Sequence, residues 1–285
     1  MNRHIIYNYS QALTERLSGY SLIPRVEDLC NIDEIVTEVQ KNNQLFCIWV
    51  DCSLMSISDL DFECVKTDTP IILYAYNIGD IFKTLCKVDL IRNHNIRIFL
   101  SSNSKENFHS VKILSSLGID MGILLDSKHI DDDLFLDLAS YALLGQVPHA
   151  SIEPFDYIWR NILQEHNLDI DTIFFNNPQK YIYINDSLDF SFSLEDLNKS
   201  CFAGNLSAID HIDFNTEVEQ KLNRYYSHFF ALDKCSKCPA FKVCDRKSIA
   251  VFNNCQEVYS TIYEYAEIRS NNESQNHNTR SLCQL

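Results

Sequence analysis

Apolar and polar residues follow two periodicities along the first half of the chain. Continuous apolar runs of strand length occur at 45–51, 70–77, 96–100 and 121–125, and 5–9 is a further candidate. Between them lie segments with apolar residues at helical spacing, at 81–91, 106–117 and 134–144. Strands that are apolar throughout and separated by helices are typical of a parallel sheet covered on both faces. The pattern therefore predicts an α/β fold, either a Rossmann-like sheet or a complete or partial β/α barrel.

The pattern becomes less regular after Pro148. It predicts a helix at 158–166, short strands at 172–175 and 181–184, a hairpin turn at 185–187 and an amphipathic helix at 216–231. We expect an α/β partial-barrel domain at 1–175, a cysteine-rich domain at 176–265 and a flexible polar tail at 266–285.

Composition and charge limit the classes of partner. Hydrophobic residues make up 46% of the chain, so a globular fold is expected. The 24 Lys and Arg against 39 Asp and Glu give a net charge of −15, which repels nucleic acid and anionic membranes and attracts basic partners such as a Lys-rich peptide. The chain shows neither an apolar signal segment nor a run long enough to span a bilayer. We therefore expect a cytoplasmic protein with reduced cysteines.

The strongest motif is CSKCPAFKVC, which places Cys235, Cys238 and Cys244 within ten residues. Thiolates at C-x-x-C spacing can bind one metal centre from a single turn, and four thiolates complete a [4Fe–4S] cluster or a tetrahedral zinc site. Cys255 is the nearest fourth ligand, and Cys201 is a more distant alternative. The motif therefore predicts one [4Fe–4S] cluster, with zinc as the alternative metal.

The other interpretation of the motif is a set of unligated core cysteines. A zinc site would be all-cysteine or use a distant ligand, because no His follows the pair at zinc-finger spacing. Cysteines outside the motif are expected to be small buried hydrophobes, and Cys47 and Cys52 are poor co-ligands because they fall on opposite faces of a strand. The cysteines to which this expectation applies are Cys30, Cys47, Cys52, Cys64 and Cys86.

A β/α-type domain followed by C-x₂-C-x₅-C resembles a radical S-adenosylmethionine peptide maturase with its C-terminal SPASM domain. In that domain the signature continues with a cysteine after three residues and a last cysteine after a gap. By position, Cys235, Cys238, Cys244 and Cys255 match the ligands of one auxiliary [4Fe–4S] cluster. Ser248 stands where the next signature cysteine would be, and Ile209 stands at the upstream cysteine position that follows Gly204. The resemblance thus implies one cluster kept and one lost.

The chain departs from this family at its N-terminal half, which lacks the C-x₃-C-x₂-C triplet that binds the S-adenosylmethionine cluster. It therefore resembles a degenerate, pseudo-radical-SAM member of the grasp-with-spasm type, and no S-adenosylmethionine is expected. The resemblance implies an accessory protein in the maturation of a ribosomally synthesised peptide. Its partners would be the precursor peptide and a modifying enzyme, either an ATP-grasp ligase or an active radical enzyme. The alternatives are an active peptide-modifying enzyme and a zinc-stabilised interaction module.

Three polar segments offer further candidate chemistry. His149 and Glu153 could form an acid/base pair, or the segment could be a helix start with Ser151 as N-cap and with Glu153 and Asp156 as first-turn acids. The acidic segment 129–133, which begins at His129, could bind a cation or could begin a helix. The segment 101–104 is a strand-end loop that could bind a ligand or serve as an ordinary N-cap turn.

Overall fold

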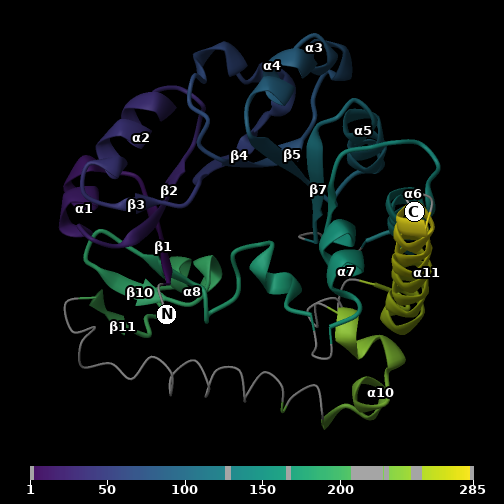
Figure 1. Ribbon diagram of the computed structural model, residues 1–285. Helices are drawn as coiled ribbons and strands as arrows, with labels where there is room; N and C mark the ends of the chain where they lie inside the picture. Colours follow the sequence, from purple (N-terminus) through teal and green to yellow (C-terminus); the bar gives the residue numbers. More distant parts are fainter. Residues whose placement is uncertain are drawn as a thin grey trace. The chain divides into compact units, whose positions relative to one another are not determined.

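A computed structural model of the chain describes residues 3–125, 130–164, 168–206, 227, 231–244 and 252–282 (Figure 1). The chain forms two compact units. Unit 1 comprises Met1–Phe99 and Phe174–His228, and unit 2 comprises Leu100–Ile173 and Phe229–Leu285. Each unit is therefore assembled from two separate stretches of sequence.

Unit 1 is built on a mostly parallel sheet. Its strands follow the order β11 (Gly204–Asn205), β10 (Asp189–Ser191), β9 (Tyr181–Ile184), β1 (His4–Asn8), β2 (Ser21–Val26), β4 (Ile48–Ser56), β5 (Ile71–Asn77) and β6 (Ile96–Ser101). β1 pairs in parallel with β2 and β9, β4 pairs in parallel with β2 and β5, and the short β3 (Gln44–Leu45) extends the pairing of β2. β10 pairs antiparallel with β9 and β11. The boundary of the two units falls within β6.

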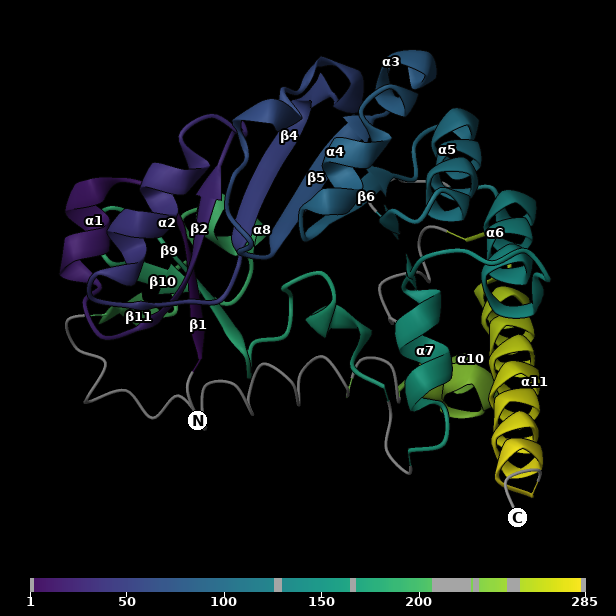
Figure 2. The same cartoon turned by 45° about the horizontal axis from the view of Figure 1, so that its top comes forward.

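Helices cover one face of these strands, as both views show (Figures 1 and 2). They are α1 (Gln11–Arg16), α2 (Ile32–Gln40), α3 (Ile81–Leu85) and α4 (Val88–Asn93), with the 3₁₀ turns η1 (Ile57–Asp59) and η2 (Phe62–Cys64). α8 (Leu194–Asn198), which follows β10, packs instead on the other face through Leu194 and Leu197. Ser10, Asp80 and Ser193 begin three of the helices by accepting a backbone N–H. Tyr7 of β1 contacts this covered face, since its hydroxyl lies 2.7 Å from that of Thr14 in α1.

The opposite face of the unit 1 sheet is filled with aromatic side chains. Neighbouring residues on a strand point to opposite faces, and Tyr7 points toward α1. Ile6 therefore points away from α1 to α4, and it shares its buried cluster with Ile23 and Trp49. Phe175, from the segment that returns to unit 1, stacks on Trp49 with ring centroids 5.5 Å apart. Tyr183 donates a 3.0 Å hydrogen bond to the Phe175 carbonyl. This buried group is the inner-face cluster of unit 1: Ile6, Ile23, Cys47, Trp49, Phe175, Tyr181 and Tyr183.

Unit 2 combines the parallel pair β7 (Asp120–Leu124) and β8 (Ile152–Glu153) with helices. Its other elements are α5 (Lys105–Ser116), α6 (Asp132–Leu144), α7 (Phe155–Asn161), η3 (Ile170–Thr172), α10 (Asp233–Ser236), η5 (Pro239–Val243) and α11 (Cys255–Leu282). α11 lies along α6 and α7 in both views (Figures 1 and 2). Phe135 of α6 joins this core, with its ring 5.2 Å from Phe155 and 5.0 Å from Phe252.

The α/β class and the mostly parallel sheet predicted from the sequence are confirmed. The predicted strands at 45–51, 70–77, 96–100 and 121–125 are β4 to β7, and the run at 5–9 is β1. The helix expected at 81–91 is divided into α3 and α4, and the hairpin at 185–187 joins β9 to β10. Most of the helix expected at 216–231 lies outside the described residues.

The prediction of a strand at 172–175 was wrong. No strand occupies 172–175, where η3 is followed by Phe175 in the left-handed region at φ 58°. The single domain expected at 1–175 is divided between the two units. The segment expected to be a flexible tail, 266–285, is helical through Leu282. α11 crosses the expected boundary at 265 because it buries Val258, Ile262 and Ala266 at helical spacing. Among the described residues, no helix is long and apolar enough to cross a membrane.

Candidate functional site

The cysteine loop, residues 235–244, lies in unit 2 and begins with α10. Cys235 is buried in α10, and its carbonyl accepts a 3.2 Å hydrogen bond from the N–H of Cys238. The Cys238 carbonyl accepts from Phe241 in turn, which starts η5, and Cys244 follows the end of η5. Cys238 and Cys244 are both partly exposed. The loop therefore carries its thiols on two short consecutive turns.

Lys242 fixes the cysteine loop to the segment that follows α7. Its carbonyl accepts a 2.9 Å hydrogen bond from the N–H of Leu168, and its ammonium donates a 2.5 Å hydrogen bond to the carbonyl of Ile162. Ala240 and Val243 are fully buried, and η5 packs against α11. The backbone between Cys238 and Cys244 is thus part of the packed core of unit 2.

The two candidates for a fourth ligand lie in different units. Cys255 is the first residue of α11 in unit 2 and is partly exposed. Cys201 belongs to unit 1, where it is exposed and its Sγ lies 3.7 Å from the carbonyl oxygen of Lys199. Cys255 therefore shares a unit with Cys235, Cys238 and Cys244, and Cys201 does not.

Four cysteine thiols are suitable ligands for a metal, but their positions in the structure do not form a metal site. Within the described residues, which include all four cysteines, no three His, Cys, Asp or Glu side chains are grouped closely enough to hold a metal ion. Cysteine metal sites commonly form together with their metal, because the binding free energy is also folding free energy. The iron–sulfur and zinc assignments thus remain predictions from the motif.

The remaining cysteines divide into buried and exposed groups. Cys47 and Cys52 are buried as expected, and burial raises the pKa of each thiol to about 12. The expectation was wrong for Cys30 and Cys86, which are exposed, and for Cys64, which is partly exposed. Asp61 accepts a hydrogen bond from Cys64 at 3.3 Å and, as the main cause, raises its pKa to about 11. Cys64 and Cys86 lie at the ends of η2 and α3, and Cys30 lies in the loop before α2, where apolar neighbours in sequence do not imply burial.

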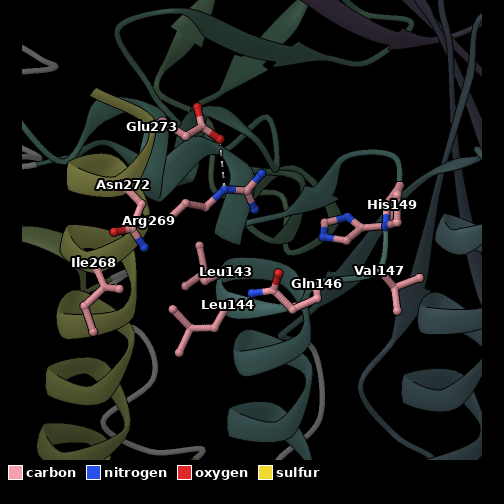
Figure 3. Close-up of a pocket in the computed structure, with 11 residues that line it drawn as sticks. Leu143, Leu144, Gln146, Val147, His149, Ile268, Arg269, Asn272 and Glu273 are labelled. Carbon is pink, nitrogen blue, oxygen red and sulfur yellow. Dashed lines mark ion pairs between the residues drawn. The ribbon is translucent and has the colours of Figure 1, made fainter. Parts of the chain in front are cut away.

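His149 lines a cavity of about 510 Å³ in unit 2, whose other walls come from the end of α6 and from α11 (Figure 3). Its Nδ1 lies 2.7 Å from the carbonyl oxygen of Ala150, and its ring lies 5.2 Å from that of Tyr141. A carbonyl only accepts, so we assign the proton to Nδ1 and leave Nε2 as the atom available to a ligand.

Glu153 and Asp156 both make hydrogen bonds with residues of α7. The Glu153 carboxylate accepts the N–H of Tyr157 at 3.1 Å, and Asp156 accepts from the Trp159 indole at 3.2 Å and from Arg160 at 2.9 Å. The helix-start interpretation is therefore the better one. Its N-cap was misplaced, however, since α7 begins after Pro154 and not at Ser151.

The other two polar segments also serve helix starts. Asp131 caps α6 by accepting the N–H of Leu134, and Asp132 accepts the N–H groups of Asn253 and Asn254 at 3.2 and 3.1 Å. His129 lies outside the described residues. In the segment 101–104, Ser104 is the N-cap of α5. The acidic segment thus joins α6 to the chain that enters α11, and its described residues are not grouped as metal ligands.

Sequence analysis missed a polar group at the carboxyl ends of β1, β2 and β4. Arg25 donates to one carboxylate oxygen of Asp51 from Nε (3.1 Å) and Nη2, and to the Asn8 amide oxygen at 3.3 Å. The Arg25 guanidinium also lies 5.3 Å from the centre of the Trp49 ring. Asn8 and Asp51 fall near the ends of the predicted strands 5–9 and 45–51, but no strand was predicted at Arg25, so the pattern held no signal for its contacts.

Neither a family model nor a curated protein matches this sequence.

Proposed function

We propose that this chain is an accessory metal-binding protein in the maturation of a ribosomally synthesised peptide. Cys235, Cys238, Cys244 and Cys255 bind one [4Fe–4S] cluster, which stabilises the cysteine loop or relays electrons. The protein binds the precursor peptide or scaffolds the modifying enzyme. No S-adenosylmethionine cluster takes part.

The observation that carries this proposal is the C-x₂-C-x₅-C loop and its attachment to unit 2. The backbone of η5 is held by Lys242 and by buried Ala240 and Val243. The loop thus offers three thiols from an anchored backbone, and α11 brings Cys255 into the same unit. Closing such a loop-rich segment on a metal adds stability that its short turns lack.

The α/β architecture supports the second part of the proposal. Parallel pairing of β9, β1, β2, β4 and β5, with helices over one face, is compatible with a partial β/α barrel. The cysteine-rich part of unit 2 would then correspond to a SPASM-like domain. The resemblance to peptide maturases that lack the catalytic triplet favours an accessory role over an active radical enzyme.

Anaerobic purification followed by iron, sulfide and zinc analysis tests the proposal. One [4Fe–4S] centre predicts about four irons and four sulfides per chain, with a broad absorption band near 400 nm. Zinc at about one per chain without iron would support the zinc-stabilised interaction module instead. A chain with neither metal would contradict both assignments.

Matched variants identify the fourth ligand. Cys255→Ser is expected to lose most of the bound iron, whereas Cys201→Ser is expected to keep it. The opposite result would assign the role to Cys201. Pull-down of a co-encoded precursor peptide by the full chain tests the accessory function separately from metal content.

A further inference from the structure

We propose that the cavity between the end of α6 and α11 binds the carboxylate of an acidic peptide side chain. The cavity measures about 510 Å³, within the usual range of ligand sites, and every wall belongs to unit 2. This inference goes beyond the proposed function, since the site is complete without the cysteine loop or a metal.

Arg269 of α11 is the central group, and its contacts leave one end of its guanidinium available. Nε faces the Glu273 carboxylate at 3.6 Å, and Nη1 donates to the Ala142 carbonyl near the end of α6. The guanidinium also lies 4.4 Å from the centre of the Trp159 ring. Among the described residues these contacts occupy two of its five N–H donors, so the Nη1–Nη2 end can still bind a carboxylate with two hydrogen bonds.

Two further polar groups face the same space. Figure 3 shows the Arg269 guanidinium, the Gln146 amide and the His149 ring directed toward a common region of the cavity. The Gln146 amide carries two N–H donors. A guanidinium with an amide donor beside it is the arrangement that an anion requires, and a cation would meet the guanidinium directly.

The apolar rim indicates a side chain with a short hydrocarbon stem. Val147 and Ile268 line the cavity and are 55% and 47% exposed, so each can cover methylene groups beside the polar centre. A glutamate side chain has this combination of an apolar stem and a terminal carboxylate. Glu273 holds Nε of Arg269, so the ligand meets the guanidinium at its far end.

Trp159 provides a direct readout because Arg269 stacks on it. The chain has two tryptophans, Trp49 and Trp159, so its NMR spectrum contains two indole N–H signals, which a Trp49→Phe variant assigns. We expect N-acetyl-glutamate α-amide to shift the Trp159 signal saturably and to leave the Trp49 signal in place. N-acetyl-glutamine α-amide, which is the same size and uncharged, is expected to cause no saturable shift.

Variants of the full chain complete the test. Arg269→Gln is expected to weaken binding about tenfold or more, since it removes a charged donor. Arg160→Gln is the matched control, because Arg160 also lies over Trp159, at 5.6 Å, but does not line the cavity. Gln146→Ala changes an exposed loop position and is expected to weaken binding even if Arg269→Gln fails to fold.

Several outcomes would overturn the proposal. They are equal shifts from the two capped amino acids, the same loss of binding in Arg160→Gln as in Arg269→Gln, or unchanged binding in Gln146→Ala. Tighter binding of free glutarate than of the capped glutamate would assign the site to a small dicarboxylate and not to a peptide. A chain that purifies without iron and still binds the capped glutamate would uphold this inference while contradicting the proposed cluster.

Discussion

Cysteines occupy two opposite environments in the two units of this protein. In unit 1, Cys47 belongs to the inner-face cluster beside Trp49, and burial raises the pKa of its thiol to about 12. In unit 2, Cys238 and Cys244 lie at the two ends of η5 and are partly exposed. Cys47 thus serves as a small buried hydrophobe, whereas Cys238 and Cys244 are accessible thiols.

Backbone context, more than residue type, therefore decides whether a cysteine can react or bind a metal. Cys52 in the buried first half of β4, and Cys47 directly before β4, are withheld from water, which disfavours the thiolate that metals and electrophiles require. A turn that is anchored by Lys242 presents thiols at the surface while its backbone stays fixed. Metal binding is therefore expected in unit 2 and not at the buried cysteines of unit 1.

The largest expected effect is a difference in thiol reactivity. At pH 8, a thiol of pKa about 12 holds about a thousandfold less thiolate than an ordinary cysteine. In metal-free protein, iodoacetamide should therefore modify Cys238 long before Cys47 or Cys52. Peptide mass spectrometry over time gives each rate. Similar modification rates for Cys47 and Cys238 would contradict the difference between the two environments. Slower modification of Cys238 in metal-loaded protein would support its role as a ligand.

The second prediction concerns the aromatic packing that closes the inner face of unit 1. Trp49 is 4% exposed and contacts the rings of Tyr74, Phe175 and Tyr183. Trp49→Ala should lower the free energy of unfolding by about 3–5 kcal/mol, because it leaves a cavity. Phe82→Ala is the control, since Phe82 is 76% exposed and should change stability little. Urea titration measures both, and equal losses would contradict the closed inner face.

The sequence pattern predicted β1 and β4 to β7 because strand burial and strand length leave a direct signature, but it missed β2, α1 and α2. It failed at 172–175, where the run Thr-Ile-Phe-Phe has the composition of a strand. Phe174 and Phe175 are apolar because they pack onto Phe99 and Trp49, with centroids 5.8 and 5.5 Å apart, and not because they pair in a sheet. Composition does not distinguish these two causes of burial.

The candidate sites were predictable to the extent that their residues are adjacent in sequence. The cysteine motif and His149 were found, whereas Arg269, Asn272 and Glu273 were assigned to or near a flexible tail because α11 is polar beyond residue 266. They reach the cavity only because α11 packs along α6, a contact between residues more than a hundred positions apart. Single-sequence periodicity carries no information about such a partner.

A third, smaller effect is expected from the ion pair at the strand ends of unit 1. Burial acts to raise the pKa of Asp51, but hydrogen bonds from Arg25 and Ser53 outweigh it and hold that pKa below its ordinary value. The stabilisation is therefore complete above the unfolded pKa of about 3.9 and is lost as the pH falls through the lower folded pKa.

Asp51→Asn should thus cost about 1.5–3 kcal/mol at pH 7 and flatten the acid dependence of unfolding. Urea midpoints measured from pH 7 to pH 3 provide the test. Glu195→Gln is a suitable control, because Glu195 is largely exposed in its pair with Lys199. An unchanged acid dependence in Asp51→Asn would show that the pair does not stabilise unit 1.

The smallest expected effect tests how dry the inner face of unit 1 is. The Tyr74 hydroxyl and the Trp49 indole N–H are buried without a hydrogen-bond partner among the described residues. An unsatisfied buried hydroxyl costs desolvation free energy, so Tyr74→Phe should be neutral or should stabilise the protein by up to about 1 kcal/mol. Tyr183→Phe is the matched control and should be destabilising, since the Tyr183 hydroxyl donates to the Phe175 carbonyl. Thermal unfolding of both variants ranks them. An equal loss of stability in Tyr74→Phe and Tyr183→Phe would contradict this. It would mean that the Tyr74 hydroxyl has a hydrogen-bond partner, such as a buried water, and that the inner face is not dry.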